Sequence, residues 1–569
     1  MSRQSFVVRF AGEGGQGMVT MAEMLARVAA DVGYHVLTFA TFPSQIIGGP
    51  TWTQARISTT PVLSPGDDVD VLVALNQDAY ATHQQEVHAS GVVLYNSDSE
   101  APPGSSNGRV LCIPLDRLAK RVGETRSVNM VVMGALAYLL HLPEKNLQEF
   151  IARRFKGRDA VIQTNLAALT LGREFAAGSE LHIGELAPPQ KPEGEQLLVK
   201  GNEALSLGAL AAGLEFYAGY PISPATPILV FMERNLMGSG RSAYQVSSEI
   251  EAITSVLGAG FAGKKAMTAT SGPGFSLMSE GLGLGWMTEV PAVVVDVQRG
   301  GPATGLPTKT EQADLLAALT PCHGDVRLPI IAPGSVEECF YAIINAFNWA
   351  ERYQGPVVLL SEMSLAERAQ NIPKPDLSRV VIENRQVYQG KDGYLRYESP
   401  EVSPMPLPGS PGAYIANASE HDPFGDTTHL PNRHIQMTER RFSKLKLLED
   451  GTYECENAQE PIALMPWGGS KGPAREAYDT LMAQGQRLGW YYTMQVHPLP
   501  PRLLEELQQK ELVLVPELNY QGQFASILRS EGIRAEAITQ YSGLPFKVRG
   551  LVKRVTKRLH APRERMAIA

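Results

Sequence analysis

The chain has 569 residues, of which 44% are hydrophobic and 19% are charged, a balance that supplies apolar material for three or four globular domains. The net charge is −8 and no lysine- and arginine-rich run stands out, which argues against nucleic acid as a partner. The start of the sequence lacks the apolar stretch of a secretory signal and the most apolar stretches are too short to cross a bilayer, so we expect a cytoplasmic protein without a membrane segment.

The first section alternates strand-like and helix-like segments from the start of the sequence to about residue 190. Apolar runs at 6–10, 34–39, 69–75 and 91–95 predict strands, and residues 18–32 predict a helix. This alternation is typical of an α/β domain with parallel strand pairing. The polar, proline-bearing stretch at 186–196 then indicates a linker.

A glycine-rich turn separates the first predicted strand from the first helix. Its sequence, GEGGQG, fits the GxGxxG pattern of dinucleotide sites through Gly12, Gly14, Gly15, Gln16 and Gly17. That pattern also needs an acidic residue at the end of the second strand, and residues 37–41 (LTFAT) contain none, which disfavours NAD. The turn is then either purely structural or a phosphate or pantetheine site beside helix N–H groups. Downstream, Gly48 and Gly49 with Arg56 predict either a second anion-binding turn or a plain hairpin.

A second α/β section follows, with predicted strands at 215–217, 265–269, 292–297 and 356–360. Residues 371–456 are rich in proline, glycine and polar residues, and we interpret them as an extended connection. Alternation of strands and helices returns from 457 to the end of the sequence.

Two clusters in the second section carry candidate acids and hydroxyls. Residues 219–226 (GYPISPAT) place Ser223 between two prolines, in a rigid turn that either aims its hydroxyl at a ligand or caps a helix. Glu249 and Glu251 stand at the start of a stretch of small and apolar residues. They are either inward-facing acids with a chemical role or exposed glutamates that favour the helix dipole.

A third cluster combines residues 268–274 (TATSGPG) with 298–308 (QRGGPATGLPT). Each segment follows a predicted strand, and ligands of open α/β sheets bind where strand ends meet helix starts. Arg299 is the fixed cation among them, and a guanidinium suits bidentate binding of a carboxylate.

These motifs resemble those of the 2-oxoacid:ferredoxin oxidoreductases. The YPISP sequence at 220–224 is similar to the YPITP motif of the family, with serine in place of threonine. The resemblance continues through Glu249–Ile250, TSGPG at 270–274, QRGGPATGLPT at 298–308 and KTEQADL at 309–315, and it looks specifically like the alpha subunit of 2-oxoglutarate enzymes. The GEGGQG turn and Ser127–Met130 resemble the gamma domain of the family, and Glu420–Asp422 and Glu517–Gln523 also look like family signatures.

The resemblance implies three α/β domains. It implies a gamma-like capping domain associated with coenzyme A at 1–190 and a pyrimidine-binding domain for thiamine diphosphate at 197–370. The extended connection covers 371–456, and a domain similar to the C-terminal domain of transketolases covers 457–569.

The resemblance also implies residue roles. Glu249 would bind the pyrimidine ring and activate the cofactor, Ser223 and Arg299 would hold the substrate carboxylate, and Thr308 would contact the tail of the 2-oxoacid. The cofactor would be bound by Tyr220, Pro221, Ile222, Glu249, Ser271 and Gly272, and coenzyme A or a phosphate by Gly12, Gly14, Gly15, Gln16 and Gly17. No metal site is expected on this chain.

The implied activity is oxidative decarboxylation of 2-oxoglutarate with coenzyme A to succinyl-CoA and CO2, with electrons passed to ferredoxin, or the reverse carboxylation. No GDG motif for the diphosphate and no CxxC spacing for a cluster is present in the sequence. We therefore expect a beta subunit that carries Mg²⁺, the diphosphate site and a [4Fe–4S] cluster, in an (alpha-beta)2 heterotetramer. The alternatives are the same chemistry on pyruvate or another 2-oxoacid, and a non-catalytic nucleotide-binding module.

Overall fold

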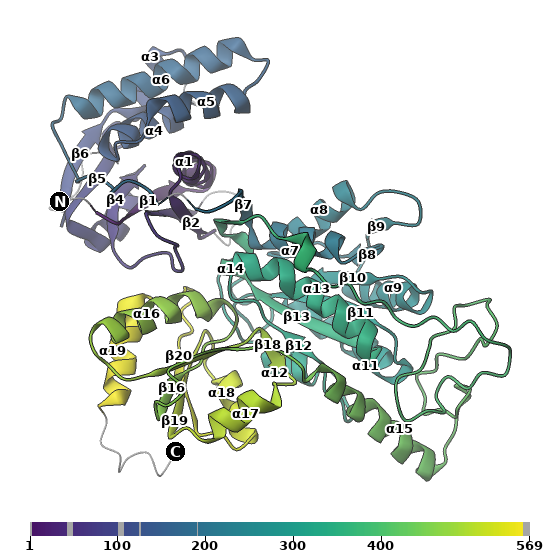
Figure 1. Cartoon of the computed structure of the whole chain (residues 1–569). Helices are drawn as coiled ribbons and strands as arrows, with labels where there is room; N and C mark the ends of the chain where they lie inside the picture. Colours follow the sequence, from purple (N-terminus) through teal and green to yellow (C-terminus); the bar gives the residue numbers. More distant parts are fainter. Residues whose placement is uncertain (1–2, 43–48, 101–106, 125–126, 191, 561–569) are drawn as a thin grey trace. The chain divides into compact units, whose positions relative to one another are not determined.

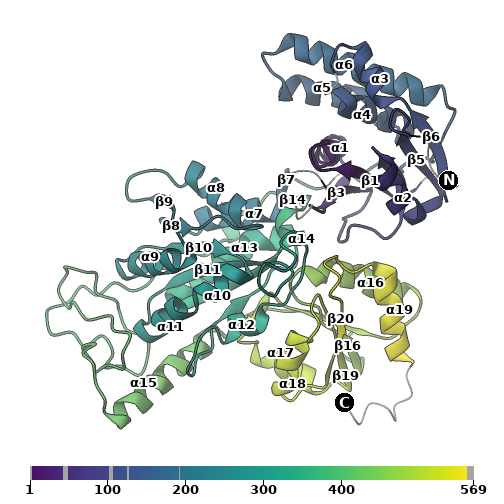
Figure 2. The same cartoon turned by 180° about the vertical axis from the view of Figure 1, so that it is seen from behind.

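The computed structural model describes residues 3–42, 49–100, 107–124, 127–190 and 192–560. The chain forms two compact units (Figures 1 and 2). One unit comprises Met1–Val199 with Glu367–Lys374, and the other comprises Lys200–Ala366 with Pro375–Ala569. The described residues form three β-sheets with helices between the strands, so the predicted α/β class is confirmed. Within the described residues, no helix is long and apolar enough to cross a membrane.

The first unit is built on an eight-stranded sheet of order β6-β5-β4-β1-β3-β2-β14-β7. Its strands are β1 (Ser5–Glu13), β2 (His35–Ala40), β3 (Pro50–Ser58), β4 (Val69–Ala74), β5 (Val87–Asn96), β6 (Arg109–Ile113), β7 (Gln196–Lys200) and β14 (Ala369–Pro373). Its helices are α1 (Met18–Val32), α2 (Gln77–His83), α3 (Leu115–Arg121), α4 (Val128–Leu139), α5 (Glu144–Arg154) and α6 (Asp159–Ala177). Helices α4 and α6 lie close along each other because glycines at 134 and 172 each meet the backbone of the other helix (Figure 1).

The expectation of purely parallel pairing in this sheet is wrong. Strands β1, β4, β5 and β6 are parallel neighbours, but β3 lies between β1 and β2 and is antiparallel to both. Only nine residues separate the end of β2 from the start of β3, which is too short for the helical crossover that parallel strands need. Because β2 is not the neighbour of β1, the glycine turn is not part of the βαβ unit that holds a dinucleotide, which argues further against NAD.

Strands β7 and β14 place the boundaries of the first unit elsewhere than at 190 and 370. Strand β14 is antiparallel to β2, and Asn371 accepts a hydrogen bond from the Val36 amide at 2.8 Å. The Lys374 amide donates to the Glu195 carbonyl at 2.9 Å. Residues 367–374 therefore belong with the first unit, since their backbone groups are satisfied by its sheet.

The second unit contains a seven-stranded sheet of order β18-β12-β13-β11-β10-β8-β9. Its strands are β8 (Phe216–Gly219), β9 (Ser242–Gln245), β10 (Ala266–Thr270), β11 (Ala292–Gln298), β12 (Ile330–Ile331), β13 (Pro356–Glu362) and β18 (Gln495–His497). Its helices are α7 (Gly201–Ala211), α8 (Thr226–Asn235), α9 (Glu249–Phe261), α10 (Gly272–Leu277), α11 (Ser279–Thr288), α12 (Leu315–Leu319), α13 (Val336–Tyr353) and α14 (Met363–Glu367). Strands β8 to β13 are parallel, and the valine-rich β11 is buried along its whole length, as expected for a sheet covered on both faces.

The last section has a five-stranded sheet of order β15-β17-β16-β19-β20. It comprises β15 (Glu454–Glu456), β16 (Ile462–Leu464), β17 (Gly489–Tyr492), β19 (Leu512–Glu517) and β20 (Ala535–Thr539), with α16 (Lys471–Ala483), α17 (Pro501–Gln508), α18 (Gln523–Ser530) and α19 (Val548–Leu559). It also supplies β18, which pairs antiparallel with β12 of the central sheet. The central and last sections are therefore joined by strand pairing within one unit.

The connection at 371–456 is irregular, as expected, but it also contains a regular helix that the sequence analysis missed. Helix α15 (Pro431–Ser443) begins with a proline at its first position and buries Arg440 and Arg441. Its sequence (PNRHIQMTERRFS) has no clear apolar periodicity, because two of its three buried residues, Met437, Arg440 and Arg441, are arginines.

Candidate functional site

The site residues predicted in the second section lie at one edge of the central sheet, whereas the predicted coenzyme A residues lie in the first unit. Residues 220–223 follow β8, Glu249 starts the helix after β9, residues 271–272 follow β10, and Arg299 follows β11. These four strands are adjacent and parallel, so their carboxyl ends meet at the same edge, which is where open α/β sheets bind ligands.

Arg299 and Ser223 are brought together, but through the backbone of Ser223. The Arg299 guanidinium donates from Nη1 to the Ser223 carbonyl at 2.6 Å, and its side chain is buried, with the residue 8% exposed. The Ser223 residue itself is exposed, so its hydroxyl is accessible to a ligand. Burial lowers the pKa of Arg299, while the charges of Asp314 and Asp296 raise it. The guanidinium stays charged, and we expect it to favour an anion at this edge.

The two glutamates of helix α9 have different environments. Glu249 is the first residue of the helix and is 5% exposed, whereas Glu251 is exposed. The Glu251 carboxylate accepts hydrogen bonds from the Ser247 amide at 2.8 Å and from the Ser247 hydroxyl, which lowers its pKa. Glu251 thus stabilises the start of the helix, and Glu249 is the inward-facing acid.

The Glu249 carboxyl lies against the turn after β10. A Cβ added at Gly274 would clash with the Glu249 carboxyl and with the Thr270 hydroxyl. The glycine of TSGPG is therefore required where the acid passes the start of helix α10. This contact joins the second and third clusters that the sequence singled out.

Two further acids belong to this edge, and the sequence analysis did not assign them to the site. Asp296 lies in β11 and is fully buried, and Asp314 lies in the loop before α12. The Asp314 amide donates to the Gln298 side chain at 3.1 Å, and its carboxyl lies beside Gly272 at the start of α10. The signal was present as one acid in a run of valines (AVVVDVQ), a position where an isolated carboxylate is costly.

The loop between Arg299 and Thr310 closes on itself at this edge. The Gly300 amide donates to the Lys309 carbonyl at 3.0 Å, and the Leu306 amide donates to the Gly300 carbonyl at 2.8 Å. Thr308 lies in this loop and is half-buried. Its predicted contact with a substrate tail stays a prediction.

The late motif at Glu517–Gln523 holds the segment that follows this loop. The Gln312 amide donates to the Leu518 carbonyl at 2.7 Å, and the Asn519 side chain donates to the Gln312 carbonyl at 2.9 Å. The Gln523 side chain donates to the Ala313 carbonyl at 2.7 Å. The motif of the last section therefore holds the loop segment 312–314, which includes Asp314, by hydrogen bonds.

The glycine turn of the first unit has the predicted strand-to-helix geometry. The Gln16 side chain folds back and its Oε1 accepts a hydrogen bond from the Glu13 amide at 2.8 Å. Gly15 and Gly17 adopt left-handed conformations with φ angles of 97° and 85°. A Cβ at Gly17 would clash with Asn129 at the start of α4, so two segments that resemble the gamma domain are adjacent. The Gly49 carbonyl accepts the Gly14 amide at 3.0 Å, while Gly48 lies outside the described residues. Arg56 is within β3 and donates to the Ser64 carbonyl at 3.0 Å, which favours the hairpin interpretation.

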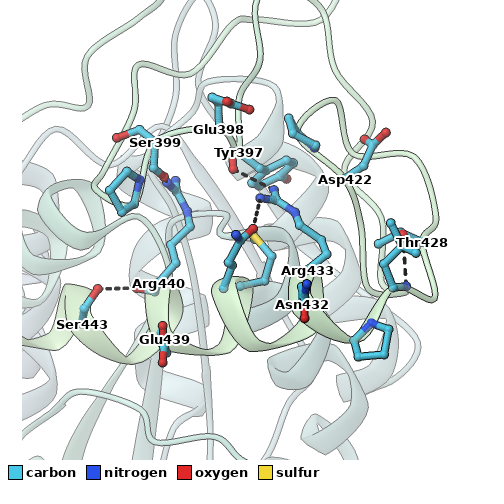
Figure 3. A pocket seen from close by; sticks show the side chains of 16 residues that line it. Tyr397, Glu398, Ser399, Asp422, Thr428, Asn432, Arg433, Glu439, Arg440 and Ser443 are labelled. Carbon is cyan, nitrogen blue, oxygen red and sulfur yellow. Dashed lines mark hydrogen bonds between the residues drawn. The ribbon is translucent and has the colours of Figure 1, made fainter.

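The Glu420–Asp422 motif lies in the connection, far from the candidate site along the central sheet. Glu420 pairs with Arg441 at 2.6 Å and with His434 at 2.6 Å. Nearby, a cavity of about 890 Å³ is lined by residues 397–400 and 422–423 and by part of the segment 428–443 (Figure 3). Arg440 lines this cavity and also pairs with Glu289 at 2.9 Å, three residues before β11 begins. The cavity is therefore at the amino ends of the strands, opposite the candidate site.

Comparison with known proteins gives a family for most of the chain. Residues 207–440 match the family described as pyruvate flavodoxin/ferredoxin oxidoreductase, thiamine diphosphate-binding, and residues 7–175 match the pyruvate ferredoxin/flavodoxin oxidoreductase family. The KorA subunit of a 2-oxoglutarate oxidoreductase from Mycobacterium tuberculosis is 31% identical over 95% of this chain and 90% of that protein. The chain belongs to the 2-oxoacid:ferredoxin oxidoreductase family.

Other members of the 2-oxoacid:ferredoxin oxidoreductase family extend the comparison. The KorA subunit of a 2-oxoglutarate synthase from Methanocaldococcus jannaschii is 35% identical over 64% of this chain and 97% of that protein. A solved 2-oxoglutarate:ferredoxin oxidoreductase from Magnetococcus marinus, with 2-oxoglutarate, coenzyme A and succinyl-CoA bound, is 36% identical over 98% of this chain with a TM-score of 0.93. The thiamine diphosphate match ends at residue 440, so the connection through α15 belongs to the same family region as the central sheet.

The residues at the candidate site fit the pyrimidine half of a thiamine diphosphate site. Glu249 is 5% exposed, and within the described part of the chain the buried Ser271 hydroxyl has no hydrogen-bond partner. Buried polar groups normally find partners, so free ones at a sheet edge favour a polar ligand. The tight approach at Gly274 leaves the acid at the mouth of the turn, where a ring nitrogen could accept or donate a proton.

Proposed function

We propose that this chain is the alpha subunit of an enzyme that oxidatively decarboxylates 2-oxoglutarate with coenzyme A to succinyl-CoA and CO2, and passes the electrons to ferredoxin. The observation that carries the proposal is the convergence of one buried acid, Glu249, and one buried cation, Arg299, at a single edge of the sheet. The 36% sequence identity, over 98% of this chain, to a solved enzyme with bound 2-oxoglutarate supports this substrate over others.

Each residue has a role that follows from its position. Arg299 binds the carboxylate next to the 2-oxo carbon, and the exposed Ser223 hydroxyl donates to the same group. Thr308 contacts the distal part of the substrate from the closed loop. Glu249 holds a proton at a pyrimidine ring nitrogen, with Tyr220, Pro221, Ile222, Ser271 and Gly272 around the ring. When bound, thiamine diphosphate would supply the carbon nucleophile and the electron sink for decarboxylation.

The stoichiometry requires a partner. One 2-oxoglutarate and one coenzyme A give one succinyl-CoA, one CO2, one proton and two electrons, and the electrons need an acceptor. The four cysteines, Cys112, Cys322, Cys339 and Cys455, are widely separated in the sequence. We therefore assign Mg²⁺, the diphosphate site and a [4Fe–4S] cluster to a beta subunit, in an (alpha-beta)2 assembly that reduces ferredoxin. Coenzyme A is assigned to the Gly12–Gly17 turn.

The test is to produce this chain alone and together with a beta-type chain that carries a GDG motif and paired cysteines. The complex should reduce a low-potential viologen dye only when 2-oxoglutarate and coenzyme A are both present, and succinyl-CoA should be found by mass spectrometry. This chain alone should be inactive. Sustained turnover by this chain alone, or a complex without activity on any 2-oxoacid, would contradict the proposal.

The second candidate is the same chemistry on pyruvate, which both matching family descriptions name. The same assay separates the two, because the ratio of kcat/KM for 2-oxoglutarate and pyruvate measures which tail the pocket binds. A higher value for pyruvate would favour this second candidate.

A further inference from the structure

Asp296 is an unusual residue for its place in the fold. It sits in the buried strand β11, opposite Thr270 of β10 and Leu360 of β13, and has no exposed surface. An ionised carboxylate in such a place costs several kcal/mol unless a partner compensates it. Asp314 faces it from the loop before α12, and neither acid forms a salt bridge within the described residues.

The carboxyl groups of Asp296 and Asp314 need an extra proton if their oxygens are to be hydrogen-bonded. Both carboxyl oxygens of Asp296, and Oδ2 of Asp314, lack a donor within the described part of the chain. The groups face each other as acceptors, so one proton between the two acids provides the missing donor. Burial, and then the neighbouring Asp314, raise the pKa of Asp296 well above its ordinary value. Burial and Glu311 raise the pKa of Asp314 to about 6, although the hydrogen bond with Asp296 and the charge of Arg299 oppose this.

The charged groups around the pair come from only a few elements. Arg299, at the end of β11, attracts both acids, and its Nε atom is buried without a partner. Glu311 lies in the same loop as Asp314, and burial raises its pKa. Among the described residues, the pair also lies beside the neutral Thr270 and Gln298 and the start of α10; Glu249 lies near Thr270 beyond them, and Glu362 is the partner of Gln298 in β13. With one shared proton, the pair carries one negative charge beside one positive guanidinium.

We propose that Asp296 and Asp314 form a carboxyl pair that shares one proton, serves as the counter-charge of Arg299, and thereby sets how tightly the site holds the carboxylate of a 2-oxoacid. This inference rests on the proposed function. The two acids are positioning residues, because they act on the substrate only through the guanidinium. A second ionised acid would repel the substrate, and a fully protonated pair would leave Arg299 uncompensated.

The test measures the KM of the assembled alpha-beta complex for 2-oxoglutarate between pH 5.5 and 7.5. For the unaltered complex, KM should fall as the pH falls toward 6, since Asp314 then loses its charge. Asp314→Asn should lower KM about fivefold at pH 7.5 and make it nearly independent of pH, while kcat changes less. A merely structural role would lower kcat and thermal stability together and leave the pH dependence of KM unchanged.

Two variants control for charge and for folding. Glu311→Gln removes a nearby negative charge outside the pair and should keep the pH dependence of KM but move it to lower pH, because Glu311 raises the pKa of Asp314. Asp296→Asn keeps a neutral hydrogen-bond donor beside Asp314, so its KM at pH 7.5 should change less than that of Asp314→Asn. Infrared spectra should show a protonated-carboxyl band in the unaltered chain that Asp296→Asn removes, and this readout does not need turnover.

The possible results distinguish failure of the proposed function from failure of the carboxyl pair. If the unaltered complex has no activity on 2-oxoacids, the proposed function fails and this inference fails with it. If it is active but Asp314→Asn leaves KM and its pH profile unchanged, or the infrared band is absent, the carboxyl pair is overturned and the proposed function stands.

Discussion

The two ends of the central sheet both bury charged residues, yet they treat them differently. At the amino ends of the strands, Glu289 is fully buried and pairs with Arg440 at 2.9 Å and Lys444 at 2.8 Å. At the carboxyl ends, Asp296 and the Nε atom of Arg299 are buried without partners in the described part of the chain. The same sheet therefore has one end where charges are compensated and another where they are not.

The difference indicates that the buried charges at the amino ends stabilise the fold and that those at the carboxyl ends serve the site. Burial alone would raise the pKa of Glu289, but Lys444 and Arg440 hold it below its ordinary value, as in a satisfied ion cluster. At the other end burial dominates and raises the pKa of Asp314 to about 6. Buried charged groups without partners are found together at functional sites, where a bound ligand supplies the missing partners. The cavity of about 890 Å³ at the amino ends (Figure 3) lies beside the satisfied cluster, so a large volume alone does not mark the active site.

The largest effect is expected from breaking the satisfied cluster. Glu289→Gln leaves the positive charges of Arg440 and Lys444 buried without an anion, and should reduce the free energy of unfolding by about 3–5 kcal/mol. Denaturant titration of the purified chain measures this loss. The activity per folded complex should stay near normal, and a selective loss of activity without loss of stability would reverse the assignment of the two ends.

Removing Arg299 at the carboxyl ends of the strands should reduce activity and leave stability largely unchanged. Arg299→Ala should lower kcat/KM for 2-oxoglutarate by roughly thirtyfold to several thousandfold, because losing one member of a desolvated charge pair costs about 2–5 kcal/mol. Steady-state kinetics of the complex measures the loss, and thiamine diphosphate affinity serves as the control. Simultaneous loss of cofactor binding and folding would make Arg299 structural.

The two glutamates of α9 provide a matched pair for the cofactor. Glu249→Gln should lower kcat by about a hundredfold or more, as expected for a positioned proton-transfer group. Glu251→Gln makes the same chemical change on the exposed face of the same helix turn, and its kcat should stay within about twofold of the unaltered value. Equal losses in both variants would remove the distinction between the buried and the exposed acid.

The smallest effect concerns the pH dependence of stability. A carboxyl whose pKa is raised on folding stabilises the fold in its protonated form, so the contribution of Asp314 is present below its ordinary pKa of 3.8 and is lost as the pH rises through about 6. Asp314→Asn should therefore gain stability relative to the unaltered chain by about 1 kcal/mol between pH 5 and pH 7. Thermal unfolding midpoints of both chains across this range check the sign, and a constant difference would contradict the raised pKa.

Much of the central site could be predicted from the sequence because its residues are consecutive in motifs. Ser223 and Arg299 each follow a predicted strand, and parallel strands bring those ends together, whereas Glu249 follows the short polar strand β9 (SAYQ), which was not predicted. What the motifs could not give is which atom makes a contact. The Arg299 guanidinium binds the Ser223 carbonyl rather than its hydroxyl, and only the three-dimensional turn determines this.

The parts that were missed have physical reasons too. Strand β3 contains alternating polar residues (PTWTQARIS), so its sequence shows no continuous apolar run although most of it is buried in the sheet. Asp296 and Asp314 are 18 positions apart, and their pairing depends on a loop that the last section of the chain clamps through Gln523. Contacts between distant segments of this kind leave no local pattern.

Strand β14 has a consequence for how the molecule can be divided. Because residues 367–374 return to the sheet of the first unit, the chain passes between the two units three times, after residues 199, 366 and 374. A fragment that ends at 190 would lack both β14 and β7 and would expose the backbone edge of β2. The first unit therefore cannot be separated by a cut at residue 190, because its sheet is completed by β7 and β14, which follow that residue, and a fragment without them would leave β2 as an exposed edge strand.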